Sequence, residues 1–299
     1  MPPDRETVVY KQIDDLAIQA DVWLPPGPGP HPVIVFIHGG ALIMGSRTGL
    51  NPAHRDAYLS DGLAVASIDY RLAPETKLAA IVEDVEDAFA WVRADGGPRF
   101  GLDPRHVAAV GHSAGGYLAL LAGARVRPHL QAIVSFYGYG DITGAWYSRP
   151  DPFYLGMPLV AEADARAGVG AGPVSSVEGS DNDPRYRFYL YCRQQGVWPE
   201  EIGGADPERD PAAFDAFCPV RHVTPGFPPT LLLHGDVDTD VPYEQSVLMA
   251  SALEAASVPH TLITIAGGGH GFDHDLDRPA VGQAFERVRA FLRRHTTLR

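Results

Sequence analysis

Residues 106–123 read His-Val-Ala-Ala-Val-Gly-His-Ser-Ala-Gly-Gly-Tyr-Leu-Ala-Leu-Leu-Ala-Gly, and this stretch decides the fold. The apolar run His106–Val110 predicts a strand, and the residues from Tyr117 to Gly123 favour a helix. Between them lies a Gly-x-Ser-x-Gly pattern, which is typical of a tight strand-to-helix turn that exposes its serine. The sequence therefore predicts that Ser113 occupies a nucleophile elbow.

Apolar runs and helical patterns alternate along the rest of the chain. Runs typical of strands buried on both faces occur at Val33–Ile37, Ala64–Ile68, Gln131–Phe136, Thr230–Leu233 and His260–Ile265. Helical spacing of apolar residues occurs at Leu78–Val92, Tyr243–Ala256 and Pro279–His295. Near the start, Thr7–Ile13 and Leu16–Trp23 flank Asp14-Asp15 and predict a hairpin. We expect an α/β fold with a doubly wound, mostly parallel sheet.

Residues 141–217 interrupt this alternation between the sixth and seventh expected strands. The segment is too long for a plain connection, and it is rich in aromatic residues, which disordered segments lack. We expect residues 1–299 to form a single catalytic domain in which 141–217 is a cap or lid.

Composition narrows the possible partners. The formal net charge of −13 opposes binding to nucleic acid and to anionic membrane surfaces. The first residues contain no apolar signal region, and no run approaches the roughly 18 apolar residues of a membrane span. We expect a cytoplasmic protein without stable membrane insertion that acts on a small molecule. Cys192 and Cys218 are expected to be buried thiols, although a bridge between them stays open, and the pattern leaves the oligomeric state undetermined.

A nucleophilic serine requires a base, a carboxylate that orients the base and donors for an oxyanion. His270 follows the last expected strand in a glycine-rich loop and is the candidate base, with His274 as its rival. Three candidates for the carboxylate follow the strand Thr230–Leu233, and the pattern alone does not choose among them: Asp236, Asp238 and Asp240.

Gly39 and Gly40 directly follow a buried strand, and their backbone amides, together with that of Ala114, are the expected oxyanion donors. A metal site is a weaker interpretation of the acidic segment Asp273–Asp277. Its ligands would be His270, Asp273, His274, Asp275 and Asp277. Carboxylates of this kind are common at solvated helix starts, so we expect no bound metal.

Taken together, these motifs resemble the α/β-hydrolase superfamily, from about Thr7 to His295. The closest resemblance is to hormone-sensitive-lipase-like esterases and to feruloyl-esterase-like and kynurenine-formamidase-like hydrolases. It is carried by His38-Gly39-Gly40, by Asp69-Tyr70-Arg71-Leu72-Ala73-Pro74-Glu75, by Gly111-His112-Ser113-Ala114-Gly115-Gly116, by the Asp238 segment and by Gly269-His270-Gly271-Phe272. Ala41 stands where the lipase-like group has a third glycine.

The resemblance implies that Ser113 is the nucleophile, His270 the base and Asp238 the orienting acid. It implies a serine hydrolase that cleaves small or aromatic carboxylic esters through an acyl-enzyme, without metal or organic cofactor. The same residues fit an amidase, such as an aryl formamidase, or a peptidase. A lipase acting on aggregated lipid and a non-catalytic small-molecule binding protein are weaker alternatives.

Overall fold

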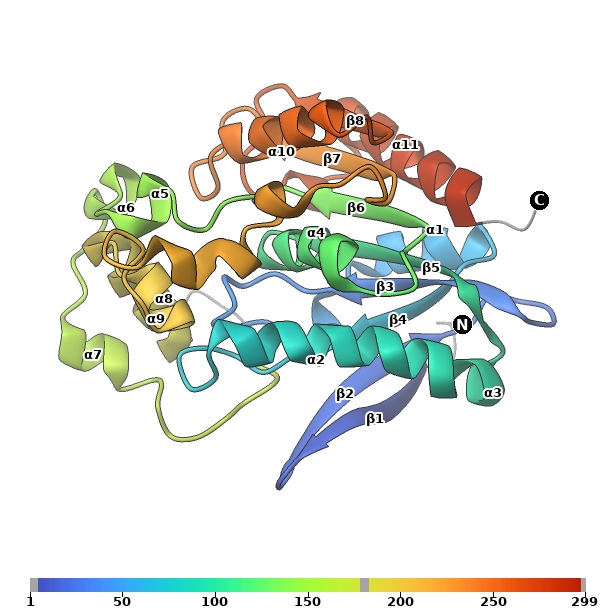
Figure 1. The fold of residues 1–299 in the computed structure, drawn as a ribbon, viewed down its shortest axis with the longest axis horizontal. Coiled ribbons are helices and arrows are strands. Elements are labelled where there is room, and N and C mark those ends of the chain that lie inside the picture. The colour runs from blue at the N-terminus through green and yellow to red at the C-terminus, as the bar shows by residue number, and fades with distance from the viewer. Residues whose placement is uncertain (1–4, 178–182, 297–299) are drawn as a thin grey trace.

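An eight-stranded sheet runs through the centre of the molecule (Figure 1). The computed structural model describes residues 5–177 and 183–296. Two segments on which expectations fell lie outside the described residues. Residues 1–4 belong to the start of the chain, where we expect no signal region, and residues 178–182 belong to the expected cap. The sheet has the order β1-β2-β4-β3-β5-β6-β7-β8. Its strands are β1 Arg5–Ile13, β2 Leu16–Trp23, β3 His31–Ile37, β4 Ala64–Ile68, β5 Leu102–His112, β6 Ala132–Phe136, β7 Thr230–Gly235 and β8 His260–Ile265.

The sheet is mixed but mostly parallel, as expected. The β1–β2 hairpin and the β2–β4 pair are antiparallel, and every other pair is parallel. The hairpin turns at Asp14, whose φ of 48° lies in the left-handed region that Asp tolerates better than most residues. Strand β5 begins at Leu102, four residues before the expected start.

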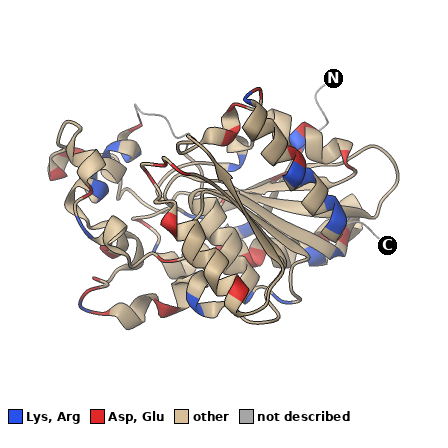
Figure 2. Ribbon diagram, turned by 90° about the horizontal axis from the view of Figure 1, so that it is seen from above, with Lys and Arg blue, Asp and Glu red and all other residues tan. Residues whose placement is uncertain are grey.

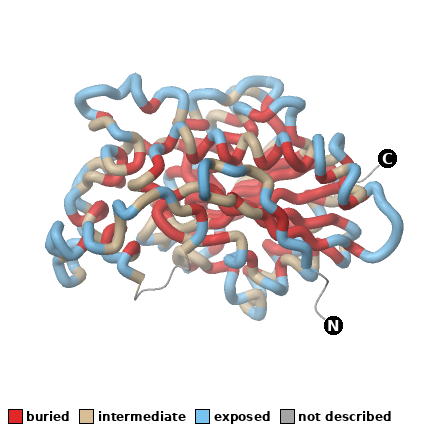
Figure 3. The backbone as a smooth tube through the Cα atoms, turned by 90° about the horizontal axis from the view of Figure 1, so that it is seen from below, coloured by how far each residue is buried: buried red, intermediate tan, exposed pale blue. Residues whose placement is uncertain are grey.

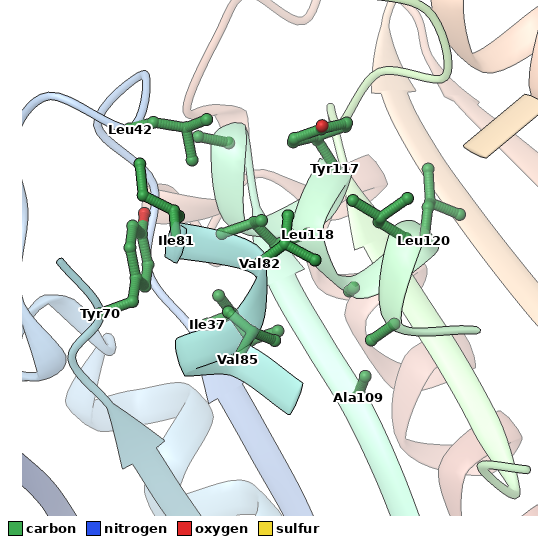
Figure 4. Close-up of a cluster of buried hydrophobic side chains, with 14 of the residues drawn as sticks. Ile37, Leu42, Tyr70, Ile81, Val82, Val85, Ala109, Tyr117, Leu118 and Leu120 are labelled. Atoms are coloured by element: carbon green, nitrogen blue, oxygen red, sulfur yellow. The ribbon is translucent and has the colours of Figure 1, made fainter. Parts of the chain in front are cut away.

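Helices cover both faces of the sheet. The longer ones are α1 Pro52–Ser60, α2 Leu78–Trp91, α4 Ala114–Arg125, α10 Glu244–Ala255 and α11 Pro279–Thr296, and a four-residue α3, Gly97–Phe100, follows α2. Helices α2, α4 and α10 contribute to one buried cluster, whereas α1 and α11 contribute to the other. Figure 4 shows Val82 of α2 beside Leu118 of α4, and Val85 of α2 beside Ile37 of β3.

Alternate residues of the central strands enter opposite cores. Val33, Val35 and Ile37 of β3 belong to the first cluster, and Ile34 and Phe36 belong to the second. Each fully buried side chain of this size contributes about 1.5–3 kcal/mol relative to an exposed one. The unbroken apolar runs of the sequence follow from this two-sided burial, which Figure 3 shows as buried strands inside an exposed shell.

The described part of the chain between β6 and β7 is mainly helical, and its α-helices lie together at one end of the sheet (Figure 1). We call residues 141–217 the insert. Its helices are α5 Ala145–Ser148, α6 Pro152–Leu155, α7 Glu162–Arg166, α8 Pro184–Gln195 and α9 Trp198–Gly203. Tyr147 stacks on Trp198 with ring centroids 4.0 Å apart and on Trp146 at 3.6 Å. These stacked rings lie in the packed interior of the insert, whereas Phe153 is exposed.

Basic and acidic residues are scattered over the outer helices and loops (Figure 2). Over residues 5–177 and 183–296, every helix falls short of the length and apolar character that a membrane crossing requires.

Cys192 and Cys218 are both free and buried, so the two thiols do not pair.

Gly115→Ala should destabilise the fold, because a Cβ at this position would lie 2.0 Å from the carbonyl oxygen of Ile37. Overpacking of this kind typically costs about 1–3 kcal/mol, and a backbone obstacle cannot rotate away. Urea denaturation of both variants should show the loss in Gly115→Ala and not in Gly269→Ala, since a Cβ at Gly269 meets nothing within 4 Å. Equal stability of the two variants would contradict the tight helix-to-strand contact.

Candidate functional site

Ser113 lies at the turn between β5 and α4 with φ 54° and ψ −120°, a backbone conformation that is rare for residues other than glycine. Its backbone N–H donates to the carbonyl of Phe136 at 2.9 Å, and its own carbonyl accepts from the N–H of Tyr117 at 3.0 Å. These bonds connect the turn to β6 and α4. The sharp turn points the hydroxyl of Ser113 away from the strand and toward His270.

His270 connects Ser113 to Asp238. The Oγ of Ser113 lies 3.0 Å from Nε2 of His270, and Nδ1 of the same ring lies 2.8 Å from Oδ2 of Asp238. Because a carboxylate only accepts hydrogen bonds, the Nδ1–H donates to Asp238 and leaves Nε2 to accept from Ser113. The structure thus brings these three predicted residues together, from three loops at the carboxyl ends of strands.

Asp238 is fixed by backbone donors. Its Oδ1 accepts from the N–H groups of Asp240 at 2.8 Å and Val241 at 3.0 Å, and Nε2 of His234 lies 3.3 Å from Oδ2. Burial alone would raise the pKa of this carboxyl, but the hydrogen bonds from His234 and His270 hold it well below its usual range. Asp238 therefore stays ionised and keeps the tautomer of His270.

The two other aspartates of the loop have different partners. Asp236 accepts from the backbone N–H of Gly267 at 2.6 Å and so joins the loops after β7 and β8. Asp240 places Oδ2 at 3.3 Å from Nε2 of His270, on the same edge of the ring that Ser113 approaches. Of the three candidates, Asp238 alone binds Nδ1, whereas Asp240 is a second carboxylate at the imidazole, which the sequence pattern did not indicate.

His270 thus lies between two carboxylates. Burial alone would lower the pKa of its imidazole, but the charge of Asp240 and the hydrogen bond to Asp238 together raise this pKa above its ordinary value. The rival, His274, lies in the short helix Phe272–His274 and lines the same cavity.

The expected oxyanion loop packs against the elbow. A Cβ on Gly39 would lie 3.2 Å from Cβ of Ser113, and Gly40 has φ +105° with the carbonyl of Met44 filling the place of a Cβ at 2.1 Å. Ala41 also has a positive φ, of 54°, so this position is left-handed although it carries a side chain. Ala114 is the first residue of α4, directly after Ser113.

Two side chains of the insert hold this loop. The indole Nε1–H of Trp198 donates to the carbonyl of Ala41 at 3.1 Å, and Nε of Arg185 donates to the carbonyl of Ile43 at 2.6 Å. Arg185 also forms a buried ion pair with Glu75 at 2.7 Å. The loop of the expected oxyanion donors is therefore braced by α8 and α9.

A cavity of about 500 Å³ opens above Ser113, within the range of small-molecule sites. Gly39, Gly40 and His270 line one part of it, and Tyr186 and Tyr189 of α8 line another. The insert therefore forms part of the cavity wall.

Asp273 is buried, contrary to its expected place at a solvated helix start. The hydroxyl of Tyr137 donates to its Oδ1 at 2.5 Å, and its Oδ2 lies 3.4 Å from Nδ1 of His112 and 3.9 Å from Nδ1 of His54. Among the described residues, these two histidines and Asp273 form the cluster with metal-ligand spacing, which differs from the set considered in the acidic run. Burial lowers the pKa of His54 to about 4.

Sequence reasoning did not predict the contributions of Arg185, described above, and of Arg193, whose guanidinium donates to Oδ1 of Asp240 at 2.8 Å. The two arginines lie on α8, where alternating charged and aromatic residues carry no recognisable motif. A signal for Asp240 was present, since it is one of three aspartates after β7, but only the folded loop separates their partners.

Two family sequence models match the chain. The BD-FAE model matches residues 20–151, and the model of the prolyl oligopeptidase family matches residues 167–299. Esterase LipC of Mycobacterium tuberculosis is 31% identical over 96% of this chain and 64% of its own length. The non-reducing polyketide synthase ausA of Aspergillus calidoustus is 31% identical over 99% of this chain, which spans only 14% of that enzyme.

A solved structure also shares the fold. A protein of unknown function from Staphylococcus aureus matches with a TM-score of 0.78 and 25% identity, over 98% of this chain and 100% of its own. The family models, the esterase relative and this fold agree with the motifs around Ser113. The chain belongs to the α/β-hydrolase superfamily.

Proposed function

We propose that the protein is a carboxylesterase-type serine hydrolase that cleaves small or aromatic carboxylic esters through an acyl-enzyme. The observation that carries this proposal is the continuous hydrogen bonding from Ser113 through His270 to Asp238 at a cavity of small-molecule size. The similarity to an esterase supports the reaction class. A non-catalytic binding protein would not require this alignment of nucleophile, base and acid.

In the proposed reaction, Nε2 of His270 takes the hydroxyl proton as Oγ of Ser113 attacks the ester carbonyl. The backbone N–H groups of Gly39, Gly40 and Ala114 stabilise the oxyanion. His270 then gives its proton to the leaving alcohol, which departs as the acyl-enzyme forms. Water activated by the same imidazole releases the acid and restores Ser113.

We assign residues 141–217 the role of a cap in a single catalytic domain. Tyr186 and Tyr189 contribute aromatic surface to the cavity, and Trp198 and Arg185 brace the oxyanion loop. An apolar wall of this kind favours small or aromatic groups over charged ones.

Amide hydrolysis is the second candidate, because the prolyl oligopeptidase family model matches residues 167–299, which hold Asp238 and His270. The same three side chains perform either reaction. The two candidates are therefore separated by their substrates.

Ser113→Ala should lower kcat on p-nitrophenyl acetate, butyrate and octanoate by at least about a thousandfold, because the acyl-enzyme cannot form. We expect wild-type turnover to fall with chain length and to exceed turnover of N-formylkynurenine. Ser60→Ala, at an exposed serine of α1, is the control and should keep full activity. Dominant formamide turnover would favour the amidase, and ester turnover that survives in Ser113→Ala would refute the assignment.

The pH profile should reflect the two carboxylates at His270. His270 must be neutral to accept a proton, and its pKa is raised, so kcat/KM should decline below a midpoint that lies above the ordinary histidine value of about 6.5. Asp240→Asn removes a charge that favours the imidazolium and should move this midpoint down. Asp236→Asn, a matched change whose carboxylate binds Gly267, should leave it in place. Equal midpoints in both variants would contradict the electrostatic role of Asp240.

A further inference from the structure

Asp240 places a carboxylate inside the cavity beside the reacting atoms. Its Oδ2 lies 3.3 Å from Nε2 of His270, and its side chain is 22% exposed and lines the same cavity as Ser113. The orienting acid, Asp238, is fully buried on the opposite edge of the imidazole. A substrate therefore meets the carboxylate of Asp240 and not that of Asp238.

The insert holds Asp240 in this orientation through one oxygen. Its Oδ1 accepts from the hydroxyl of Tyr154 at 2.6 Å, from the hydroxyl of Tyr189 and from the guanidinium of Arg193 at 2.8 Å. Arg193 is 1% exposed and also binds Asp151 at 2.6 Å. These donors fix the carboxylate and leave Oδ2 on the side of His270.

Because Oδ2 of Asp240 lies close to Nε2 of His270, it lies on the side of the site where the leaving alcohol is expected. In the proposed reaction Nε2 of His270 delivers its proton to the alcohol oxygen, which must come within about 3 Å of that nitrogen. Oδ2 of Asp240 is 3.3 Å from the same atom. A substituent on the carbon next to the leaving oxygen can therefore reach this carboxylate.

We propose that Asp240 selects the alcohol part of the substrate, favouring esters of alcohols that carry a second hydroxyl beside the ester oxygen and rejecting those that carry a carboxylate. This inference rests on the proposed esterase function. A carboxylate accepts hydrogen bonds and donates none, so a neighbouring hydroxyl gains a charge-assisted bond. A second carboxylate at the same place meets like charge in a protein of net charge −13.

Three acetates of similar size test the proposal: 2-hydroxyethyl acetate, propyl acetate and acetoxyacetate, with acetate release followed in a pH-stat. The wild-type protein should prefer 2-hydroxyethyl over propyl acetate about tenfold in kcat/KM and should disfavour acetoxyacetate by a similar factor. In Asp240→Ala the first ratio should approach one, and acetoxyacetate should become comparable to propyl acetate. Asp240→Asn keeps an acceptor without the charge, so it should retain part of the hydroxyl preference and lose the discrimination against acetoxyacetate.

Ratios within one variant cancel any loss of folded protein, which matters because Asp240 also anchors the insert. Tyr154→Phe is the matched control: it removes a donor to Oδ1, leaves Oδ2 in place and should keep the wild-type ratios. Wild-type ratios near one, or ratios that persist in Asp240→Ala, would overturn the selection by Asp240 while ester hydrolysis stands. If the wild-type protein hydrolyses neither these acetates nor p-nitrophenyl esters, the proposed function itself falls, and this inference falls with it.

Discussion

The close contact between α4 and the ends of β3 and β5 is the constraint on which the site depends. Gly115 packs so tightly that a Cβ would meet the carbonyl of Ile37, and the chain can enter α4 only by a sharp turn at Ser113. The strained φ of 54° at Ser113 costs free energy that the buried sheet and helix offset. The same contact brings Gly39 against the turn, so the proposed nucleophile and the proposed oxyanion loop are positioned together.

A second constraint comes from buried charge. Arg185 and Arg193 lie on α8 and are almost fully buried, and each is paired with carboxylates from the remainder of the fold. An unpaired buried charge is strongly unfavourable, so the insert can dock only where Glu75 and Asp240 receive these arginines. Arg185 also donates to the carbonyl of Ile43, so the insert is tied to the proposed oxyanion loop on one side, and through Asp240 to His270 on the other.

Periodicity and turn chemistry predicted the sheet because strands buried on both faces must be continuously apolar, as in Val33–Ile37. The approach of Ser113 and His270 was predictable because both follow expected strands, and parallel strands end at one edge of a sheet. The arrangement of the insert could not be predicted from hydrophobic periodicity. Its helices are held by ion pairs between residues far apart in the sequence, such as Arg185 with Glu75. The pattern of residues alone did not separate Asp236, Asp238 and Asp240, whereas the family resemblance implied Asp238. The backbone path of Asp236–Val241 gives each of the three different partners.

The backbone path of Asp236–Val241 places two carboxylates, those of Asp238 and Asp240, against the imidazole of His270. Asp238 orients the ring through Nδ1, whereas Asp240 favours the protonated state through Nε2. Raising the pKa of the imidazole makes it a stronger base once neutral, but it also reduces the neutral fraction at a given pH. A substrate group that binds Oδ2 of Asp240 would screen this charge from His270 only while the site is filled. Selection of the alcohol and tuning of the base would then depend on the same carboxylate, so a change at Asp240 affects both together.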